Sequence, residues 1–125
     1  MQILGLSSNQ ITDISIFEKA KFGQLQNLYL DGNQITNIEV FGKVKIPKLL
    51  ELNLSSNKIN NINVFAKVKF NKLKELLLTN NNITDINALE KVKFEQLQKL
   101  ELGGIQLFYQ QMDRYIFVVV IYLVY

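Results

Sequence analysis

Glu51 and Glu75 are the two side chains whose spacing comes closest to a catalytic arrangement. They lie 24 residues apart, and if that interval is one structural repeat, the carboxylates stack about 5 Å apart, the separation found in retaining glycosidases. The chain contains no His and no Cys, which excludes Ser/His/Asp and Cys/His nucleophiles and the usual zinc ligands. Because nothing beside the two carboxylates supplies a cleft or a substrate subsite, we predict no enzymatic activity and no metal or cofactor site.

The interval of 24 residues recurs from residue 1 to residue 107. Asn returns once in each unit, with Leu before it and Ile after it. The repeating positions include Asn9, Asn33, Asn57 and Asn81; Leu4, Leu28, Leu52, Leu76 and Leu100; and Ile11, Ile35, Ile59 and Ile83. A period in the twenties indicates a stacked solenoid, because a single unit cannot bury its own apolar face.

The first half of each unit predicts a short strand that ends in a turn. In Leu28-Tyr29-Leu30 the apolar residues alternate, which places both leucines on one face of a strand and Tyr29 on the other. Asn33 then falls where the chain turns away, and an amide can pair with both backbone N–H and C=O groups. We therefore expect an internal structural ladder rather than a ligand site, made by Asn9, Asn33, Asn57 and Asn81.

The second half of each unit predicts a short helix or tight turn on the opposite, convex side. A bulky apolar residue is followed three residues later by a smaller one, and this gap suits one helical turn. The pairs are Phe17 and Ala20, Phe41 and Val44, Phe65 and Val68, and Leu89 and Val92. Residues 88–94 are one such segment. The aromatic residues at the equivalent positions of the other units are expected to fill the core.

Each unit reads Leu-x-x-Leu-x-Leu-x-x-Asn-x-Ile-x-x-Ile, as in residues 25–38. Over residues 1 to about 107 this pattern resembles the leucine-rich repeat family. It is similar to the short intracellular class typified by the leucine-rich regulatory subunit of type-1 protein phosphatase, and to bacterial internalin-type surface proteins, where Ile-Thr-Asp-Ile, as at residues 83–86, is common. The resemblance implies an α/β fold: a right-handed solenoid of about 4.5 repeats with a concave parallel β-sheet and short convex helices or turns.

Charged residues divide between the two sides of the expected solenoid. Eight lysines form a convex lysine ridge: Lys19, Lys21, Lys43, Lys45, Lys67, Lys69, Lys91 and Lys93. The outward strand positions form a mainly acidic concave surface, here called the strand face: Asn27, Tyr29, Asp31, Glu51, Asn53, Glu75, Leu77, Thr79, Lys99 and Glu101. Because complementary potentials favour association, we expect the strand face to bind a protein with a basic surface. Tyr29 is either an interface anchor or an ordinary strand-favouring surface residue.

The lysine ridge has two interpretations. It is either a solvated face whose stems cover the Phe and Val layer, or a docking strip for acidic protein, anionic lipid or nucleic-acid phosphate. Nucleic acid is the weakest of these partners, because Arg114 is the single arginine of the chain.

Residues 108–125 depart from the repeat. Ile105 stands where a fifth ladder asparagine is due, and residues 115–125 form an uninterrupted apolar run shorter than the roughly 17–20 residues that cross a bilayer as a helix. Three interpretations are open: a β-rich cap over the end of the solenoid, the first part of a membrane anchor, or non-native sequence.

These features predict a non-catalytic protein-protein interaction module or scaffold that binds through the strand face. Its flat footprint falls below the roughly 800 Å² per partner of a stable interface, so we expect a fragment of a longer array or a weak binder. The alternative is a membrane-peripheral structural spacer that uses the lysine ridge and the apolar tail. The absence of Cys favours a reducing intracellular setting, cytoplasmic or nuclear, with membrane association as the alternative.

Overall fold

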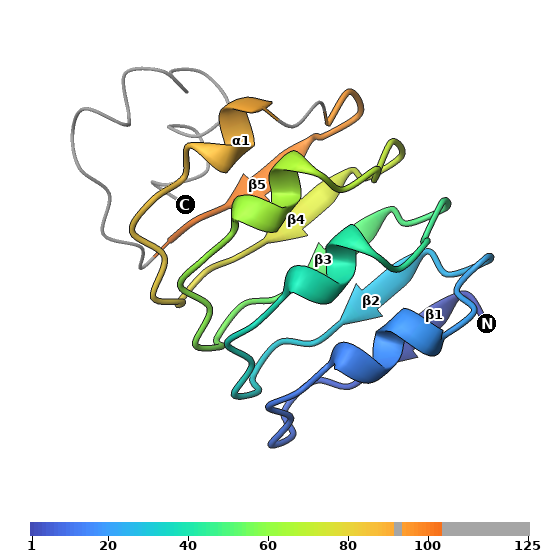
Figure 1. Ribbon diagram of the computed structural model, residues 1–125, viewed down its shortest axis with the longest axis horizontal. Helices are drawn as coiled ribbons and strands as arrows, with labels where there is room; N and C mark the ends of the chain where they lie inside the picture. The colour runs from blue at the N-terminus through green and yellow to red at the C-terminus, as the bar shows by residue number, and fades with distance from the viewer. Residues whose placement is uncertain (92–93, 104–125) are drawn as a thin grey trace.

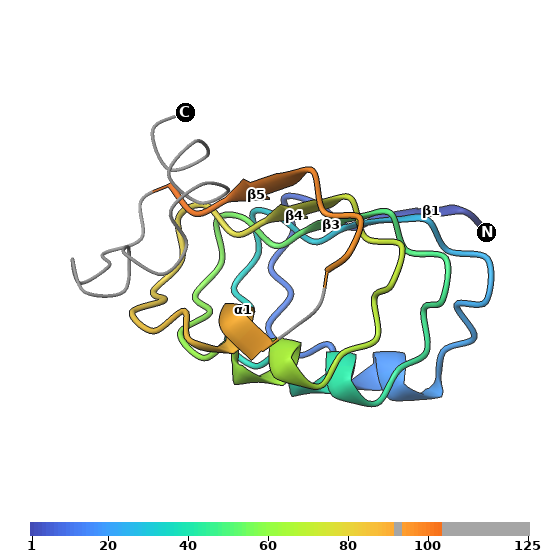
Figure 2. The same ribbon diagram turned by 90° about the horizontal axis from the view of Figure 1, so that it is seen from above.

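The fold is a stack of similar coils, seen in a computed structural model that describes residues 1–91 and 94–103. One side is a single parallel sheet whose five strands follow chain order. The strands are β1 (Ile3–Gly5), β2 (Asn27–Tyr29), β3 (Glu51–Asn53), β4 (Glu75–Leu77) and β5 (Lys99–Glu101). The opposite side carries the 3-10 helices η1 (Ser15–Lys19), η2 (Glu39–Gly42) and η3 (Asn63–Ala66) and the short α-helix α1 (Ala88–Lys91) (Figure 1, Figure 2). The predicted solenoid is confirmed.

The strands pair at the register that the 24-residue period predicts. Leu28 lies opposite Leu4 on one side and Leu52 on the other, and the series continues through Leu76 to Leu100. Equivalent residues therefore stack on one another, and each coil covers the apolar edge of the next. Leu28, Leu30, Leu52 and Leu54 are fully buried as a result.

The aromatic residues fill the layer beneath the helical segments, as predicted. Phe41 meets Phe70 of the next coil edge to face, with ring centroids 6.0 Å apart, and Phe65 meets Phe94 in the same way at 6.4 Å. Ile46 replaces the corresponding ring opposite Phe17, and Phe17 instead packs against Phe22 of its own coil at 5.4 Å. The Phe41–Phe70 and Phe65–Phe94 pairs join neighbouring coils on the side away from the sheet.

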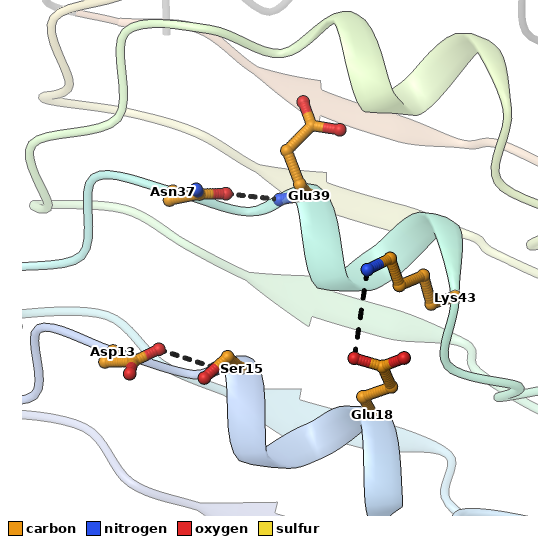
Figure 3. A network of polar contacts seen from close by, with 6 residues as sticks. All are labelled: Asp13, Ser15, Glu18, Asn37, Glu39 and Lys43. Carbon is orange, nitrogen blue, oxygen red and sulfur yellow. Dashed lines mark hydrogen bonds and ion pairs between the residues drawn. The ribbon is translucent and has the colours of Figure 1, made fainter.

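An Asp or Asn side chain fixes the start of each helical segment. The Oδ1 atom of Asn37 accepts a hydrogen bond from the backbone N–H of Glu39 at 2.8 Å, and Asp13 does the same for Ser15 (Figure 3). Asn61 and Asp85 repeat the contact in the next two coils. This backbone hydrogen bond holds the pKa of Asp13 below its usual range. Of the predicted segment 88–94, residues 88–91 are helical, and residues 92–93 lie outside the described part.

The turn after each strand requires a left-handed backbone. Residues Ser8, Gly32, Ser56 and Asn80 occupy the same repeat position and have φ angles between 55° and 70°. Glycine adopts this conformation without strain, whereas a side chain makes it costlier. A Cβ atom at Gly32 would also lie only 3.3 Å from the backbone of Ser8. This turn leads the chain into each ladder asparagine.

The segment for which three interpretations are open, residues 108–125, lies outside the described residues, as does Ile105. Over residues 1–91 and 94–103, no helix is long and apolar enough to cross a membrane.

Candidate protein-interaction face

The strand register arranges the strand face in rows that run across the sheet. One row contains Ile3, Asn27, Glu51, Glu75 and Lys99, and the next contains Gly5, Tyr29, Asn53, Leu77 and Glu101. Asp31 and Thr79 lie two residues after Tyr29 and Leu77, so the alternation of side chains keeps them on the same side. The structure thus brings the ten predicted residues to one surface.

Tyr29 and Asn27 are bound to Glu51 of the next coil. The Tyr29 hydroxyl donates to Glu51 Oε2 at 2.9 Å, and Asn27 Nδ2 donates to the same oxygen at 3.0 Å. Burial, followed by the hydrogen bond to Glu51, raises the pKa of Tyr29. All three side chains are half-buried, and they form an ordered cluster at one end of the face.

Glu75 separates this cluster from an ion pair on β5. It lies between Glu51 and Lys99 in register, and its carboxylate makes no hydrogen bond or ion pair to any described residue. Lys99 Nζ instead contacts Glu101 Oε1 at 3.2 Å, and that bond raises the pKa of Lys99. Asp31 Oδ1 accepts a 2.6 Å hydrogen bond from Ser7. Four carboxylates against one ammonium make the strand face acidic, and the Glu75 carboxylate is the free one.

The apolar part of the strand face differs from the sequence prediction. Leu77 occupies the expected row, but only 9% of its surface is exposed, because Asn53 and Glu101 flank it in register. Leu77 is therefore a poor contact residue. Ile3 is 61% exposed at the head of the other row, and the sequence interpretation missed it. The signal was available, since Ile3 stands at the repeat position of Asn27.

Three of the four predicted ladder asparagines lie inside the stack. Asn57 Nδ2 donates to the carbonyl of Leu54 in its own coil and of Leu30 in the preceding coil, both at 3.0 Å. Its Oδ1 accepts from the backbone N–H of Ile35, also in the preceding coil, at 3.0 Å. Asn33 and Asn81 make the equivalent bonds and are equally buried.

For Asn9 the prediction of an internal position is wrong. The side chain is exposed and bonds to carbonyls of its own coil, those of Leu6 and Ser7. The physical reason is that the ladder bonds reach backwards to the preceding coil, whereas Asn9 lies in the first coil that the structure describes. In Asn33, Asn57 and Asn81 both the amide nitrogen and the amide oxygen are engaged by backbone groups, as a structural role requires. The described residues also contain no cluster of three or more potential metal ligands.

Family models for leucine-rich repeats match most of this repeating region. A leucine rich repeat model matches residues 23–83, and a model of two leucine rich repeat copies matches residues 1–41. The chain belongs to the leucine-rich repeat family. No curated protein sequence matches it.

Solved leucine-rich repeat structures resemble the chain in fold. Internalin C2 from Listeria monocytogenes superimposes with a TM-score of 0.73 and 32% identity, covering 86% of this chain and 44% of internalin C2. A plant peptide hormone receptor, RGFR1 in complex with RGF2, superimposes with a TM-score of 0.68 and 21% identity, covering 93% of this chain and 19% of the receptor. A chain of the BIR3–SERK2 complex from Arabidopsis thaliana superimposes with a TM-score of 0.62 and 24% identity, covering 83% of this chain and 56% of that one.

The chain spans less than two thirds of each of these three proteins. At their identities the two plant structures bear on the fold alone. The internalin structure agrees with one of the two resemblances inferred from the repeat ending, while the likeness to the phosphatase regulatory subunit stays a prediction.

Proposed function

We propose that this leucine-rich repeat chain is a non-catalytic protein-interaction module that binds a basic protein surface through its strand face. The observation that carries the proposal is the Glu75 carboxylate, which makes no hydrogen bond or ion pair with a described residue and lies between an ordered cluster and an ion pair. A lysine or arginine of a partner that reaches this position would meet a carboxylate that need not first break a bond within the chain.

The surroundings of Glu75 are suited to recognition because they are already ordered. Tyr29, Asn27 and Glu51 are held in place by their mutual hydrogen bonds. Side chains that are fixed before binding lose less conformational entropy in the complex. Tyrosine is also enriched at interface hot spots, which supports the anchor interpretation of Tyr29.

Two of the structural neighbours, which share the fold of this chain, were solved in complexes. RGFR1 was solved with RGF2, and the other plant chain was solved within the BIR3–SERK2 complex. Their partners are not carried over to this chain. The small area of five three-residue strands favours weak binding, or binding by a longer array of which this chain is a part. An intracellular setting stays a prediction.

The test is a charge reversal with a matched control. The triple variant Glu51→Lys, Glu75→Lys and Glu101→Lys changes the strand face, while Glu18→Lys, Glu39→Lys and Glu95→Lys makes the same change in net charge elsewhere. Each protein is immobilised, and captured cellular proteins are quantified by mass spectrometry after its folding is checked by circular dichroism. We expect the control triple to capture the same basic proteins as the unaltered chain, and the strand-face triple to lose them.

Equal loss in both triples would attribute capture to general electrostatics, and unchanged capture by the strand-face triple would exclude this face. Binding to vesicles that contain phosphatidylserine, with no captured protein, would favour the membrane-peripheral spacer instead.

A further inference from the structure

Two adjacent grooves cross the lysine ridge between successive coils. A groove of about 450 Å³ lies between the second and third coils and is lined by residues 41–47 and 67–71. A groove of about 400 Å³ lies between the first and second coils, and the two grooves share Lys43, Val44, Lys45 and Pro47. The two grooves therefore lie side by side, and the residues that they share belong to the return segment between η2 and β3.

The larger groove combines an apolar floor with a cationic rim. Val44, Ile46 and Phe70 are buried in its floor, and Val68 is half-buried. The rim consists of four exposed lysines, Lys43, Lys45, Lys67 and Lys69.

Three of these rim lysines carry uncompensated charge. Lys43 contacts Glu18 of the preceding coil at 3.9 Å (Figure 3). Among the described residues, no carboxylate pairs with Lys45, Lys67 or Lys69. The side chains of Lys91 and Lys93, which would extend the ridge, lie outside the described part of the structure.

We propose that these grooves bind an acidic polypeptide segment in which a small apolar side chain is flanked by carboxylates. The apolar side chain enters a groove and contacts its floor, while the flanking carboxylates meet the lysine heads on the rim. The grooves are lined by residues of the helical segments and of the return segments that follow them, and no strand-face residue lines them, so the chain can hold an acidic partner in the grooves and a basic partner on the strand face. The proposal does not depend on the function proposed for the strand face.

The position of the apolar groups favours a polypeptide over a lipid bilayer. A peripheral protein inserts apolar side chains that project beyond its charged ones, whereas here the apolar groups lie beneath the lysine heads. A flat bilayer would touch only those heads. A narrow chain can enter the groove and use both features.

Nucleic acid is disfavoured by the same geometry. Binding of single strands relies on exposed aromatic rings on which bases stack. Phe70 and Phe22 lie in the grooves but are buried, with exposed fractions of 4% and 6%. A nucleic acid strand would therefore contact the lysines through its phosphates, and its bases would have no exposed ring to stack on.

The test uses a fluorescein-labelled ten-residue peptide of alternating Asp and Val, with binding followed by fluorescence anisotropy. Comparison peptides replace Asp by Ser, or Val by Gly. The groove variant Lys45→Glu with Lys69→Glu is matched by Lys58→Glu with Lys72→Glu, which changes the net charge equally at exposed lysines outside the groove lining. Vesicles containing phosphatidylserine and a ten-nucleotide oligothymidylate serve as the other probes.

We expect the groove variant to bind the Asp/Val peptide about tenfold more weakly than the unaltered chain, and the control variant to bind it within about twofold. Both comparison peptides should bind more weakly, and binding should weaken as salt rises. The proposal is overturned if the Asp/Val peptide does not bind, if both lysine variants lose binding equally, if the Gly peptide binds as well, or if vesicles or the oligonucleotide bind more tightly than the peptide.

Discussion

At the scale of single residues, Asn57 shows how one amide joins two coils. It bonds to Leu30 and Ile35 of the preceding coil and to Leu54 of its own. We expect Asn57→Ala to reduce the free energy of unfolding by about 1–3 kcal/mol, because buried backbone groups lose their partner. Asn9→Ala serves as the control in urea denaturation, since Asn9 is exposed and bonds only within its own coil. Equal losses from the two substitutions would contradict the ladder.

Tyr29 links stability to alkaline pH. Its pKa is raised, first by burial and then by the hydrogen bond to Glu51. A raised pKa in the folded state contributes stability that is fully present below the unfolded pKa of about 10 and is lost as pH rises through the folded pKa. We expect the stability of the unaltered chain relative to Tyr29→Phe to fall above about pH 10. Urea denaturation of both proteins between pH 8 and pH 11 measures this difference, and lysines common to both cancel.

A difference between the two proteins that stays constant over that range would show that Tyr29 titrates alike in the folded and unfolded chain. The hydrogen bond to Glu51 would then be too weak in solution to order the cluster.

The sequence predicted residue roles well where one chemical need decides them. An amide at a buried turn pairs with both kinds of backbone group, so the positions of Asn33, Asn57 and Asn81 followed from the repeat alone. The roles of Tyr29 and Leu77 depend on side chains 22 to 24 residues away. Alternation along a strand says which face a side chain occupies, but not whether its neighbours cover it.

At the scale of elements, an Asp or Asn lies just before each helical segment and accepts a hydrogen bond from the backbone N–H two residues ahead. Asn61 accepts from the N–H of Asn63 at the start of η3. We expect Asn61→Ala to lower the free energy of unfolding by about 0.5–1 kcal/mol. The backbone N–H of Asn63 would lose its side-chain acceptor and would bond to water instead. Asn61→Asp keeps the oxygen and should stay close to the unaltered chain. Thermal and urea denaturation measure both, and an Asp variant as unstable as the Ala variant would contradict the capping role.

The sequence interpretation missed this cap, although Asp13, Asn37, Asn61 and Asp85 recur with the period. Their side chains are exposed, and a search for apolar repeats passes over them. It also predicted a helix or tight turn without deciding between them, because a spacing of three residues suits both. The left-handed turn at Ser8, Gly32, Ser56 and Asn80 was hidden by the use of Ser at two positions.

At the scale of the whole molecule, contacts run between neighbouring coils. We expect deletion of residues 34–57, one complete unit, to leave a folded chain, because Asn33 is then followed by Lys58 in the phase that Gln34 had. Strand β2 would pair directly with β4, and the denaturant slope should fall with the lost surface. Circular dichroism and urea denaturation follow the outcome.

Deletion of residues 34–45, half a unit, is the matched control. It places helical-side residues where strand residues belong, and we expect it to unfold the chain. Two deletions that are tolerated equally would show that the phase of the repeat is unimportant.

The overall fold could be predicted from the sequence because the repeat is strict. Once one coil is inferred, the period fixes the register of every strand. The environment of the first coil was not accessible in this way. Ile3, Asn9 and Ile16 are exposed because burial in a stack comes from the coil before, and a local motif carries no information about that neighbour.

The uniform step between coils makes length the easiest property of this molecule to alter. A coding sequence whose units are each 72 nucleotides long, three for each of 24 residues, can gain or lose one unit by unequal recombination without disturbing the phase of the others. Each such event would lengthen or shorten the sheet by one strand, about 4.8 Å. Evolution can thus adjust the reach of this surface in whole increments, while every existing contact keeps its geometry.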